Sequence, residues 1–136
     1  MKSATEFVSL RNSDDPIDYH RASHEEAPND VWLAVIREYP DMAKWVAQNK
    51  TISPCIMDEL IEIDDVSIHL VLAMKRSCPA RILLKLATSR YEAVRNAVAL
   101  NKKTPSDILH ILTNDEWEIC ASNAAIQLAR RNHSRP

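Results

Sequence analysis

Two histidines, His20 and His24, stand four residues apart and are followed directly by Glu25 and Glu26. On a helix this spacing places both imidazoles on one face, where they could ligate a metal ion together. Zinc sites in proteins use three or four side-chain ligands, and no third ligand stands nearby in the sequence. We therefore expect this pair to lie on a solvated helix face, and we predict no metal site.

The three cysteines, Cys55, Cys78 and Cys120, are spaced by 23 and 42 residues, which matches neither a disulfide framework nor a paired zinc motif. We expect them to be reduced and at least partly buried. Glycine is absent, which excludes phosphate-binding loops and dinucleotide fingerprints, because both need glycine for close backbone approach. No catalytic string such as G-x-S-x-G or H-E-x-x-H occurs. The sequence predicts no catalytic residue, no cofactor and no enzyme activity.

The elements that carry these residues belong to an internal repeat. Residues 41 to 126 repeat with a period of 26 positions and without a gap. Such a period is typical of a solenoid, in which each copy buries its apolar face against its neighbours. The sequence therefore predicts an all-α solenoid of about three and a half two-helix repeats. Six positions are apolar in every copy: Met42, Ile68 and Val94; Val46, Leu72 and Val98; Ala47, Ala73 and Ala99; Ile56, Ile82 and Ile108; Met57, Leu83 and Leu109; Leu60, Leu86 and Leu112.

Each repeat divides into two helical stretches around a polar break. In the first stretch of the third copy, Val94, Ala97, Val98 and Leu100 recur at helical spacing and are expected to face inward. Trp45, in the first copy, occupies the position that Ala97 has in the third copy, and we expect it in the core.

Prolines mark where the second stretches begin. Pro54, Pro79 and Pro105 stand at or near the same position of the three copies, where a missing N–H costs nothing at a helix start. Thr104 is expected to cap the last of these helices with its hydroxyl.

The pattern extends beyond the three copies. It predicts a leading helix near residues 29 to 38 and a final helix near residues 117 to 130. Phe7, Val8 and Leu10 indicate one short helix before the repeats, and Pro16 indicates the start of another. One domain is predicted for residues 1–136: an N-terminal helical cap at 1–27, repeats at 28–126, and a C-terminal helix end with a frayed tail at 127–136.

The third copy contains a pattern that runs from Tyr91 to Leu112 and includes Val94, Arg95, Val98, Ala99, Asn101, Thr104, Pro105, Ile108 and Leu109. A repeat with this pattern resembles the leucine-rich repeat variant, a bacterial family related in shape to HEAT repeats. The resemblance covers about residues 28 to 126 and implies a right-handed superhelix of alternating helices. The founding type of that family carries a cysteine-rich iron–sulfur segment, which this chain lacks, so no cluster is expected. Small repeat proteins of this size also resemble some bacterial immunity proteins, which block a cognate toxin.

Charge is distributed unevenly along the chain. Residues 1 to 68 have a net charge of −8 and residues 69 to 136 a net charge of +6. Such fields act on encounter rate and on partner choice, so we expect a charged macromolecular partner. An alternative is that solvated helix faces carry these charges without function. A second alternative is phosphate binding by the basic run, which comprises Lys75, Arg76, Arg81, Lys85, Arg90, Arg95, Lys102 and Lys103.

Several positions on the second helices vary from copy to copy while the core positions stay apolar. In related superhelices these helices line the concave surface, so the variable positions are expected to form a groove graded from acidic to basic. Leu84 and Ile111 are either apolar anchors in this groove or additional core residues. The candidate partner-binding residues are Leu33, Arg37, Asp58, Glu59, Glu62, Asp64, Arg81, Leu84, Lys85 and His110.

These observations favour a non-catalytic protein-binding solenoid. The most concrete form is an immunity or antitoxin-like protein whose acidic half occludes a basic toxin domain. Nucleic-acid binding through the basic half is the alternative, and a structural adaptor is the third. The sequence has no apolar stretch long enough to cross a membrane and no signal-peptide core, so we expect a cytoplasmic protein without a membrane partner.

Overall fold

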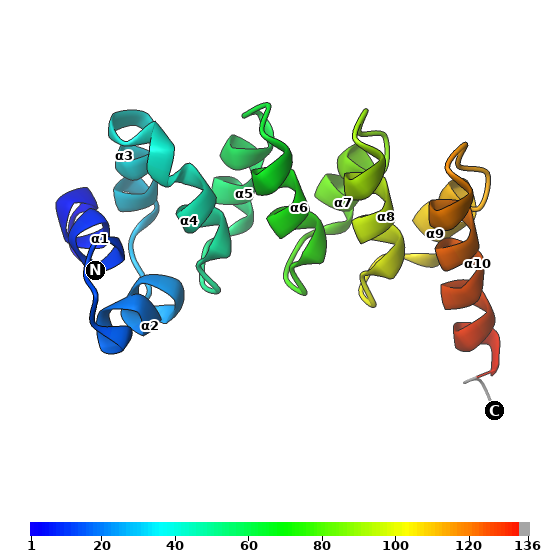
Figure 1. Cartoon of the computed structure of the whole chain (residues 1–136), viewed down its shortest axis with the longest axis horizontal. Coiled ribbons are helices and arrows are strands. Elements are labelled where there is room, and N and C mark those ends of the chain that lie inside the picture. The colour runs from blue at the N-terminus through cyan, green and yellow to red at the C-terminus, as the bar shows by residue number, and fades with distance from the viewer. Residues whose placement is uncertain (134–136) are drawn as a thin grey trace. The chain divides into compact units, whose positions relative to one another are not determined.

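The computed structural model describes residues 1–133, and this part of the chain is all-α, with ten α-helices, one short 3-10 helix and no strand (Figure 1). The predicted all-α class is confirmed. The helices are α1 (Ala4–Arg11), α2 (Pro16–His24), α3 (Asn29–Glu38), the 3-10 helix η1 (Pro40–Met42), α4 (Ala43–Gln48), α5 (Pro54–Ile61), α6 (Val66–Met74), α7 (Ala80–Leu86), α8 (Glu92–Leu100), α9 (Ser106–Leu112) and α10 (Glu118–His133).

The predicted elements are present with small shifts at their ends. Helix α3 coincides with the leading helix expected near residues 29–38, and α1 and α2 are the two helices expected before the repeats. Helix α10 begins at Glu118 and continues to His133, three residues beyond the expected end. The tail that we expected to be frayed includes residues 134–136, which lie outside the described residues.

Prolines do stand at helix starts, as predicted. Pro16 and Pro54 are the first residues of α2 and α5, while Pro79 and Pro105 occupy the cap positions directly before α7 and α9. A proline is tolerated at these positions because the first turn of a helix leaves its N–H groups without a partner in the helix.

The role predicted for Thr104 is wrong. Pro105 holds the cap position of α9, and no side chain caps that helix end. Thr104 is instead buried, and its hydroxyl donates a 2.7 Å hydrogen bond to the carbonyl of Val98. The hydroxyl therefore closes the C-terminal end of α8, where backbone carbonyls lack helical partners.

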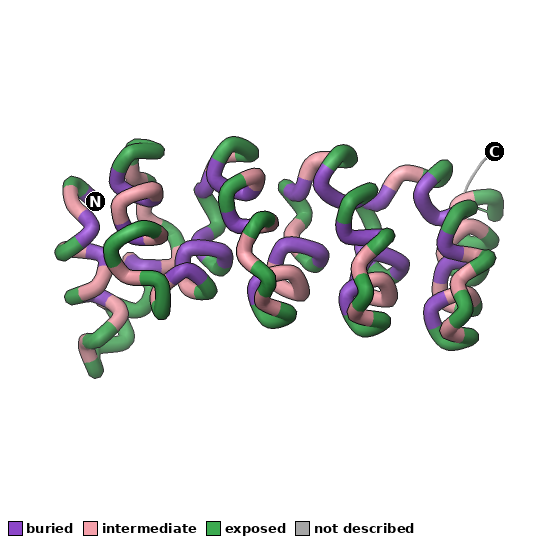
Figure 2. Tube along the Cα trace, turned by 90° about the horizontal axis from the view of Figure 1, so that it is seen from above, coloured by how far each residue is buried: buried purple, intermediate pink, exposed green. Residues whose placement is uncertain are grey.

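The apolar columns of the repeat form the core. Every position in the six columns is buried, apart from Met42, which is half-buried. Figure 2 shows buried stretches that recur from helix to helix. In α3, the aligned residues Val31, Trp32 and Val35 are buried as well, and Trp32 packs edge-on against Phe7 of α1 with ring centroids 5.2 Å apart. The period of 26 thus identifies the buried faces of the helices.

The helices gather into two compact units, Met1–Leu72 and Ala73–Pro136. In the N-terminal unit, α1 packs against α2 and α3, and α3 packs against α4 and α5. In the C-terminal unit, α8 packs against α7, α9 and α10, and α10 also lies against α9 (Figure 1).

Three expectations about burial are wrong. Leu100 is 56% exposed, because it follows Ala93 and Asn96 along the outer face of α8. Trp45 is only half-buried, and the guanidinium of Arg11 covers its ring at 3.7 Å. Cys55 is exposed, although Cys78 and Cys120 are buried as expected.

Candidate protein-binding surfaces

Six of the candidate residues lie in the N-terminal unit, on or next to two helices that pack together. Helix α3 carries Leu33 and Arg37, and α5 with the residues just after it carries the acidic side chains. The contact between α3 and α5 brings these two groups to neighbouring elements. Arg37, Glu59, Glu62 and Asp64 are exposed, whereas Leu33 and Asp58 are half-buried.

The other four candidate residues lie in the C-terminal unit. Arg81, Leu84 and Lys85 are exposed on α7, and His110 is exposed on α9. The spacing of three and four residues places Leu84 and Lys85 beside Arg81 on one side of α7. Leu84 is 46% exposed and Ile111 is 54% exposed, so their interpretation as additional core residues is wrong.

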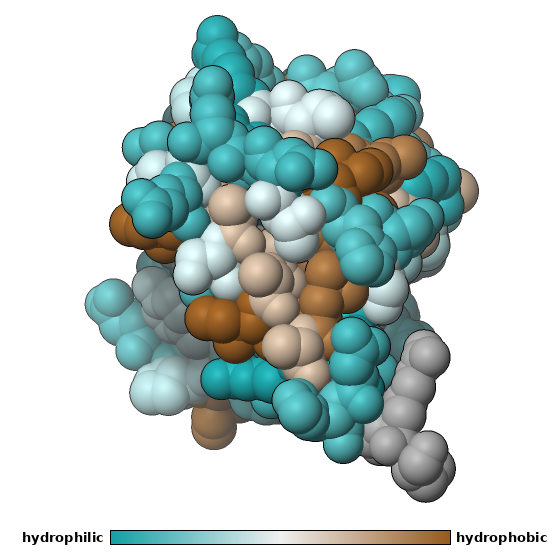
Figure 3. Space-filling model, turned by 90° about the vertical axis from the view of Figure 1, so that its right-hand side faces the viewer, coloured by the Kyte–Doolittle hydropathy of each residue, from teal (hydrophilic) through white to brown (hydrophobic). Residues whose placement is uncertain are grey.

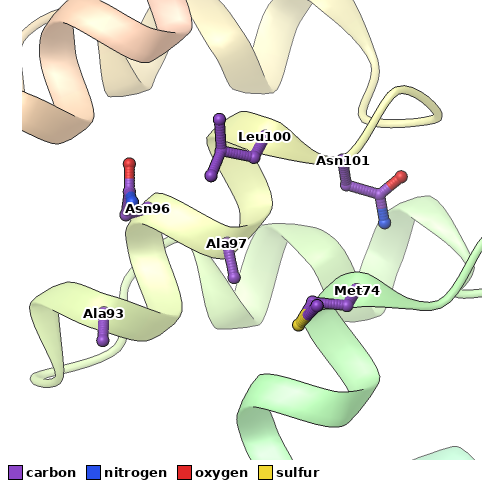
Figure 4. Close-up of a pocket in the computed structure, with 6 residues that line it drawn as sticks. All are labelled: Met74, Ala93, Asn96, Ala97, Leu100 and Asn101. Carbon is purple, nitrogen blue, oxygen red and sulfur yellow. The ribbon is translucent and has the colours of Figure 1, made fainter.

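A second exposed row in the C-terminal unit was missed by the sequence reasoning. Met74, Leu100 and Ile126 stand one period apart, and their side chains are 70%, 56% and 46% exposed. Between the first two, the end of α6 and the outer face of α8 enclose a hollow of about 250 Å³ (Figure 4). Its lining is mainly apolar and consists of Met74, Ala93, Asn96, Ala97, Leu100 and Asn101. The same 26-residue register, applied to this position, would have identified the row.

The polar groups in this lining are already used within the fold. Asn101 is buried, and its amide donates to the carbonyls of Ala73 (2.8 Å) and Lys75 (3.0 Å). The oxygen of its side chain accepts from the N–H of Lys103 at 2.9 Å. Asn96 accepts a 2.8 Å hydrogen bond from Asn123 on α10. The hollow is therefore suited to an apolar group more than to a polar ligand.

A second buried asparagine makes the same kind of connection in the N-terminal unit. The amide of Asn49 donates to the carbonyls of Ala22 (2.8 Å) and Glu25 (3.1 Å), and its oxygen accepts from the N–H of Thr51. Asn49 and Asn101 stand two periods apart, and this recurrence in the sequence could have indicated their shared structural role. Each buried side chain thus donates to two backbone carbonyls of the preceding repeat.

The histidine pair forms a stack on α2. The rings of His20 and His24 lie 3.9 Å apart and almost parallel, and Nδ1 of His24 is 2.7 Å from the hydroxyl of Ser23. Among residues 1–133, no group of three His, Cys, Asp or Glu side chains is arranged to hold a metal ion. The pair by itself offers two ligands at most.

Two of the three thiols are unsuited to nucleophilic chemistry. Burial raises the pKa of Cys78 to about 11, and burial also raises the pKa of Cys120 to about 11, with Asp115 adding to the effect. A thiol with such a pKa stays protonated near neutral pH, and the thiolate is the reactive form.

The members of the basic run differ in exposure. Arg95 donates two hydrogen bonds to Asp115, at 2.7 and 3.2 Å, and the hydrogen bonds hold the pKa of that carboxyl below its usual value. Lys102 and Lys103 are exposed in the turn after α8, as are Arg81 and Lys85 on α7. Arg95 therefore stabilises the fold, whereas Arg81, Lys85, Lys102 and Lys103 are accessible to solvent.

None of the helices in the described part of the chain is long and apolar enough to span a membrane. Searches of protein-family models, of curated proteins and of solved structures found no match to this chain. The assignment of a function rests on the residues themselves and on their geometry.

Proposed function

We propose that this chain is a non-catalytic protein-binding module, a right-handed α-solenoid of the leucine-rich repeat variant or HEAT-like kind. The observation that carries the proposal is the exposure of large apolar side chains beside charged ones on the second helices. Leu84, 46% exposed, lies between Arg81 and Lys85 on α7. Ile111, 54% exposed, follows His110 on α9.

Exposed apolar side chains of this size gain free energy when a protein partner covers them. Full burial of a leucine or isoleucine side chain contributes about 1.5–3 kcal/mol, and such residues bind best when charged neighbours form the rim around them. A partner that covers Leu84 and Ile111 would gain this free energy. The repeat supports such a role because it holds both side chains on rigid helices.

The most concrete form of the proposal is an immunity or antitoxin-like protein. Glu59, Glu62 and Asp64 are exposed in the N-terminal unit, whose residues up to Ile68 have a net charge of −8. A basic toxin domain would be attracted to this acidic surface, and charge complementarity of this kind accelerates encounter and selects partners. Binding there would occlude the active site of the toxin.

A second candidate function is nucleic-acid binding through the C-terminal unit. Arg81, Lys85, Lys102 and Lys103 are exposed and could contact phosphates. Arg95, which belongs to the same basic run in the sequence, is hydrogen-bonded to Asp115 and is not counted among them. A structural adaptor in a larger complex is the third candidate.

The test is a binding measurement between the full chain and the toxin domain encoded by a neighbouring reading frame. We expect tight binding that Glu59→Lys and Glu62→Lys each weaken by about tenfold or more, because each reversal places a like charge against a basic partner. Glu116→Lys is the matched control, since the side chain of Glu116 is 91% exposed in the other unit.

A different pattern of results would overturn the proposal. If the toxin domain does not bind, or if the two reversals and the control have the same effect, the acidic surface does not bind the toxin. A salt-dependent affinity for DNA or RNA that Lys85→Glu and Lys102→Glu abolish would favour the second candidate.

A further inference from the structure

The exposed apolar row in the C-terminal unit runs beside a row of basic side chains. Met74 and Leu100 are the last residues of α6 and α8, and Arg76 and Lys102 follow them by two residues, in the turns after these helices. All four side chains are exposed. The apolar row continues on α10 with Ile126, and Figure 3 shows apolar side chains bordered by hydrophilic ones at this end of the unit. Helices α6 and α8 thus each end with an exposed apolar side chain next to a basic one.

The fold does not require an apolar side chain in this row. In the first copy the corresponding residue is Gln48, which is exposed at the end of α4, and Lys50 follows it by two residues. The basic position is therefore common to three copies, whereas the apolar position is confined to the later ones. Exposed apolar side chains that gather beside charged ones are typical of a surface that binds another molecule.

The hollow between Met74 and the outer face of α8 has the size for a single side chain. Figure 4 shows Met74, at the end of α6, across from Ala97 of α8, and Ala93 lies one turn earlier on α8. The volume of the hollow is about 250 Å³. Small-molecule pockets usually measure about 300–1,000 Å³, whereas an apolar cavity of about 150 Å³ is large enough for benzene. The hollow therefore has room for one large aliphatic or aromatic side chain.

We propose that this hollow binds one bulky apolar side chain of an acidic segment in a partner protein. The apolar group lies against Met74, Ala97 and Leu100, and carboxylates beside it in the partner meet Arg76 and Lys102. Complementary charges of this kind select partners and fix their register. An apolar centre with a polar rim is also the usual composition of a protein interface.

The shape and the charges of the site favour a protein segment over a membrane surface. A membrane takes up apolar side chains that protrude from a protein, whereas the small side chains of Ala93 and Ala97 line a hollow here. Glu92 is exposed at the start of α8 and places a negative charge at the other end of the hollow from Lys102. The carboxylates of the partner are therefore held near Lys102, which gives the bound segment one direction.

A peptide-binding measurement with the full chain tests this site. The probe is a short fluorescein-labelled peptide that carries one tryptophan among aspartates and glutamates, and fluorescence anisotropy measures its affinity. We expect binding that weakens as the salt concentration is raised, because salt screens the ionic contacts. Replacing the tryptophan by serine, or the acidic residues by glutamine, should each raise the dissociation constant about tenfold or more.

Variants of the chain test where the peptide binds. Ala93 is exposed, so Ala93→Trp fills the hollow without disturbing the core and should raise the dissociation constant about tenfold. Ala129→Trp is the matched control, since Ala129 is exposed on α10. Arg76→Glu and Lys102→Glu should weaken binding by a similar factor, and Lys85→Glu on α7 is their control. Circular dichroism must show the same helix content for every variant.

This site is separate from the surfaces that carry the proposed function, which lie on α3, α5, α7 and α9, so the two proposals fail independently. An acidic peptide that does not bind up to about 1 mM would overturn the inference. Equal affinity for the serine or glutamine peptide, or equal effects of Ala93→Trp and Ala129→Trp, would overturn it as well. Binding to vesicles of phosphatidylserine and phosphatidylcholine without binding to the peptide would assign the row to a membrane instead.

Discussion

Arg95 of α8 binds Asp115, in the turn before α10, through two hydrogen bonds. The Nε–Oδ2 distance is 2.7 Å and the Nη2–Oδ1 distance is 3.2 Å, and the two side chains are only 11% and 6% exposed. Arg95 also donates to the carbonyl of Ser89 at 2.8 Å, and Asp115 accepts from the N–H of Trp117. The pair therefore fixes the turns at the starts of α8 and α10 relative to each other.

Removing this carboxylate should destabilise the fold. Asp115→Ala leaves the guanidinium of Arg95 largely buried without its partner, so we expect the free energy of unfolding to fall by about 3 kcal/mol. Glu116→Ala is the control, because its carboxylate lies 3.8 Å from the same guanidinium but is 91% exposed. The control should cost less than about 1 kcal/mol. Urea denaturation measures both, and equal losses would contradict the importance of the Asp115 contact.

Acid should remove the contribution of Glu25. Hydrogen bonds from Arg21 and from the amino group of Met1, at 2.8 and 2.9 Å, lower the pKa of Glu25 to about 2. Its pKa is lower in the folded chain than in the unfolded chain, where it has the ordinary value of 4.5. The carboxylate therefore stabilises the fold fully when the pH is above 4.5. This stabilisation is lost as the pH falls toward 2.

The comparison of wild type with Glu25→Gln measures this effect. The difference in unfolding free energy should be largest at neutral pH and should shrink steadily below about pH 4.5. An N-terminal extension, which moves the amino group away from Glu25, should reduce the difference at neutral pH. A difference that does not change with pH would contradict the ion pair.

Asn101 should be more important for stability than its size suggests. Asn101→Ala removes the two hydrogen bonds to the carbonyls of Ala73 and Lys75 and the one from the N–H of Lys103, and we expect the free energy of unfolding to fall by about 2 kcal/mol. Asn96→Ala is the matched control, because the Asn96 side chain is half-buried and accepts its bond from another side chain. Chemical denaturation should show a clearly smaller loss for the control.

The helices and their buried faces could be predicted because a single period governs both. A residue such as Leu83 recurs as Met57 and Leu109, and the only way to bury all three is to place the same helix face inward in each copy. The starts of helices could be predicted at the prolines for a similarly local reason. A proline ring is not tolerated in the interior of a helix but is tolerated in its first turn.

Contacts that depend on the turn geometry could not be predicted. Thr104 has the residue type of a cap, but the backbone turns so that its hydroxyl reaches Val98 instead. Arg95 and Asp115 are 20 residues apart, and neither periodicity nor composition indicates that they meet. The exposure of Leu84 and Ile111 could not be predicted either, because the residue type alone does not tell whether an apolar side chain is exposed or buried. Only packing separates them.

The three thiols should differ in reactivity by their environment. Cys55 is exposed, whereas Cys78 and Cys120 are buried with a pKa of about 11 each. At pH 8 a thiol with this pKa is a thiolate in roughly one molecule in a thousand. We therefore expect a disulfide reagent such as Ellman's reagent to modify one thiol rapidly in the native protein and all three in denaturant. Cys55→Ser should remove the rapid reaction, and a rapid reaction that persists in this native variant would show that α7 or α10 opens to expose its neighbouring thiol.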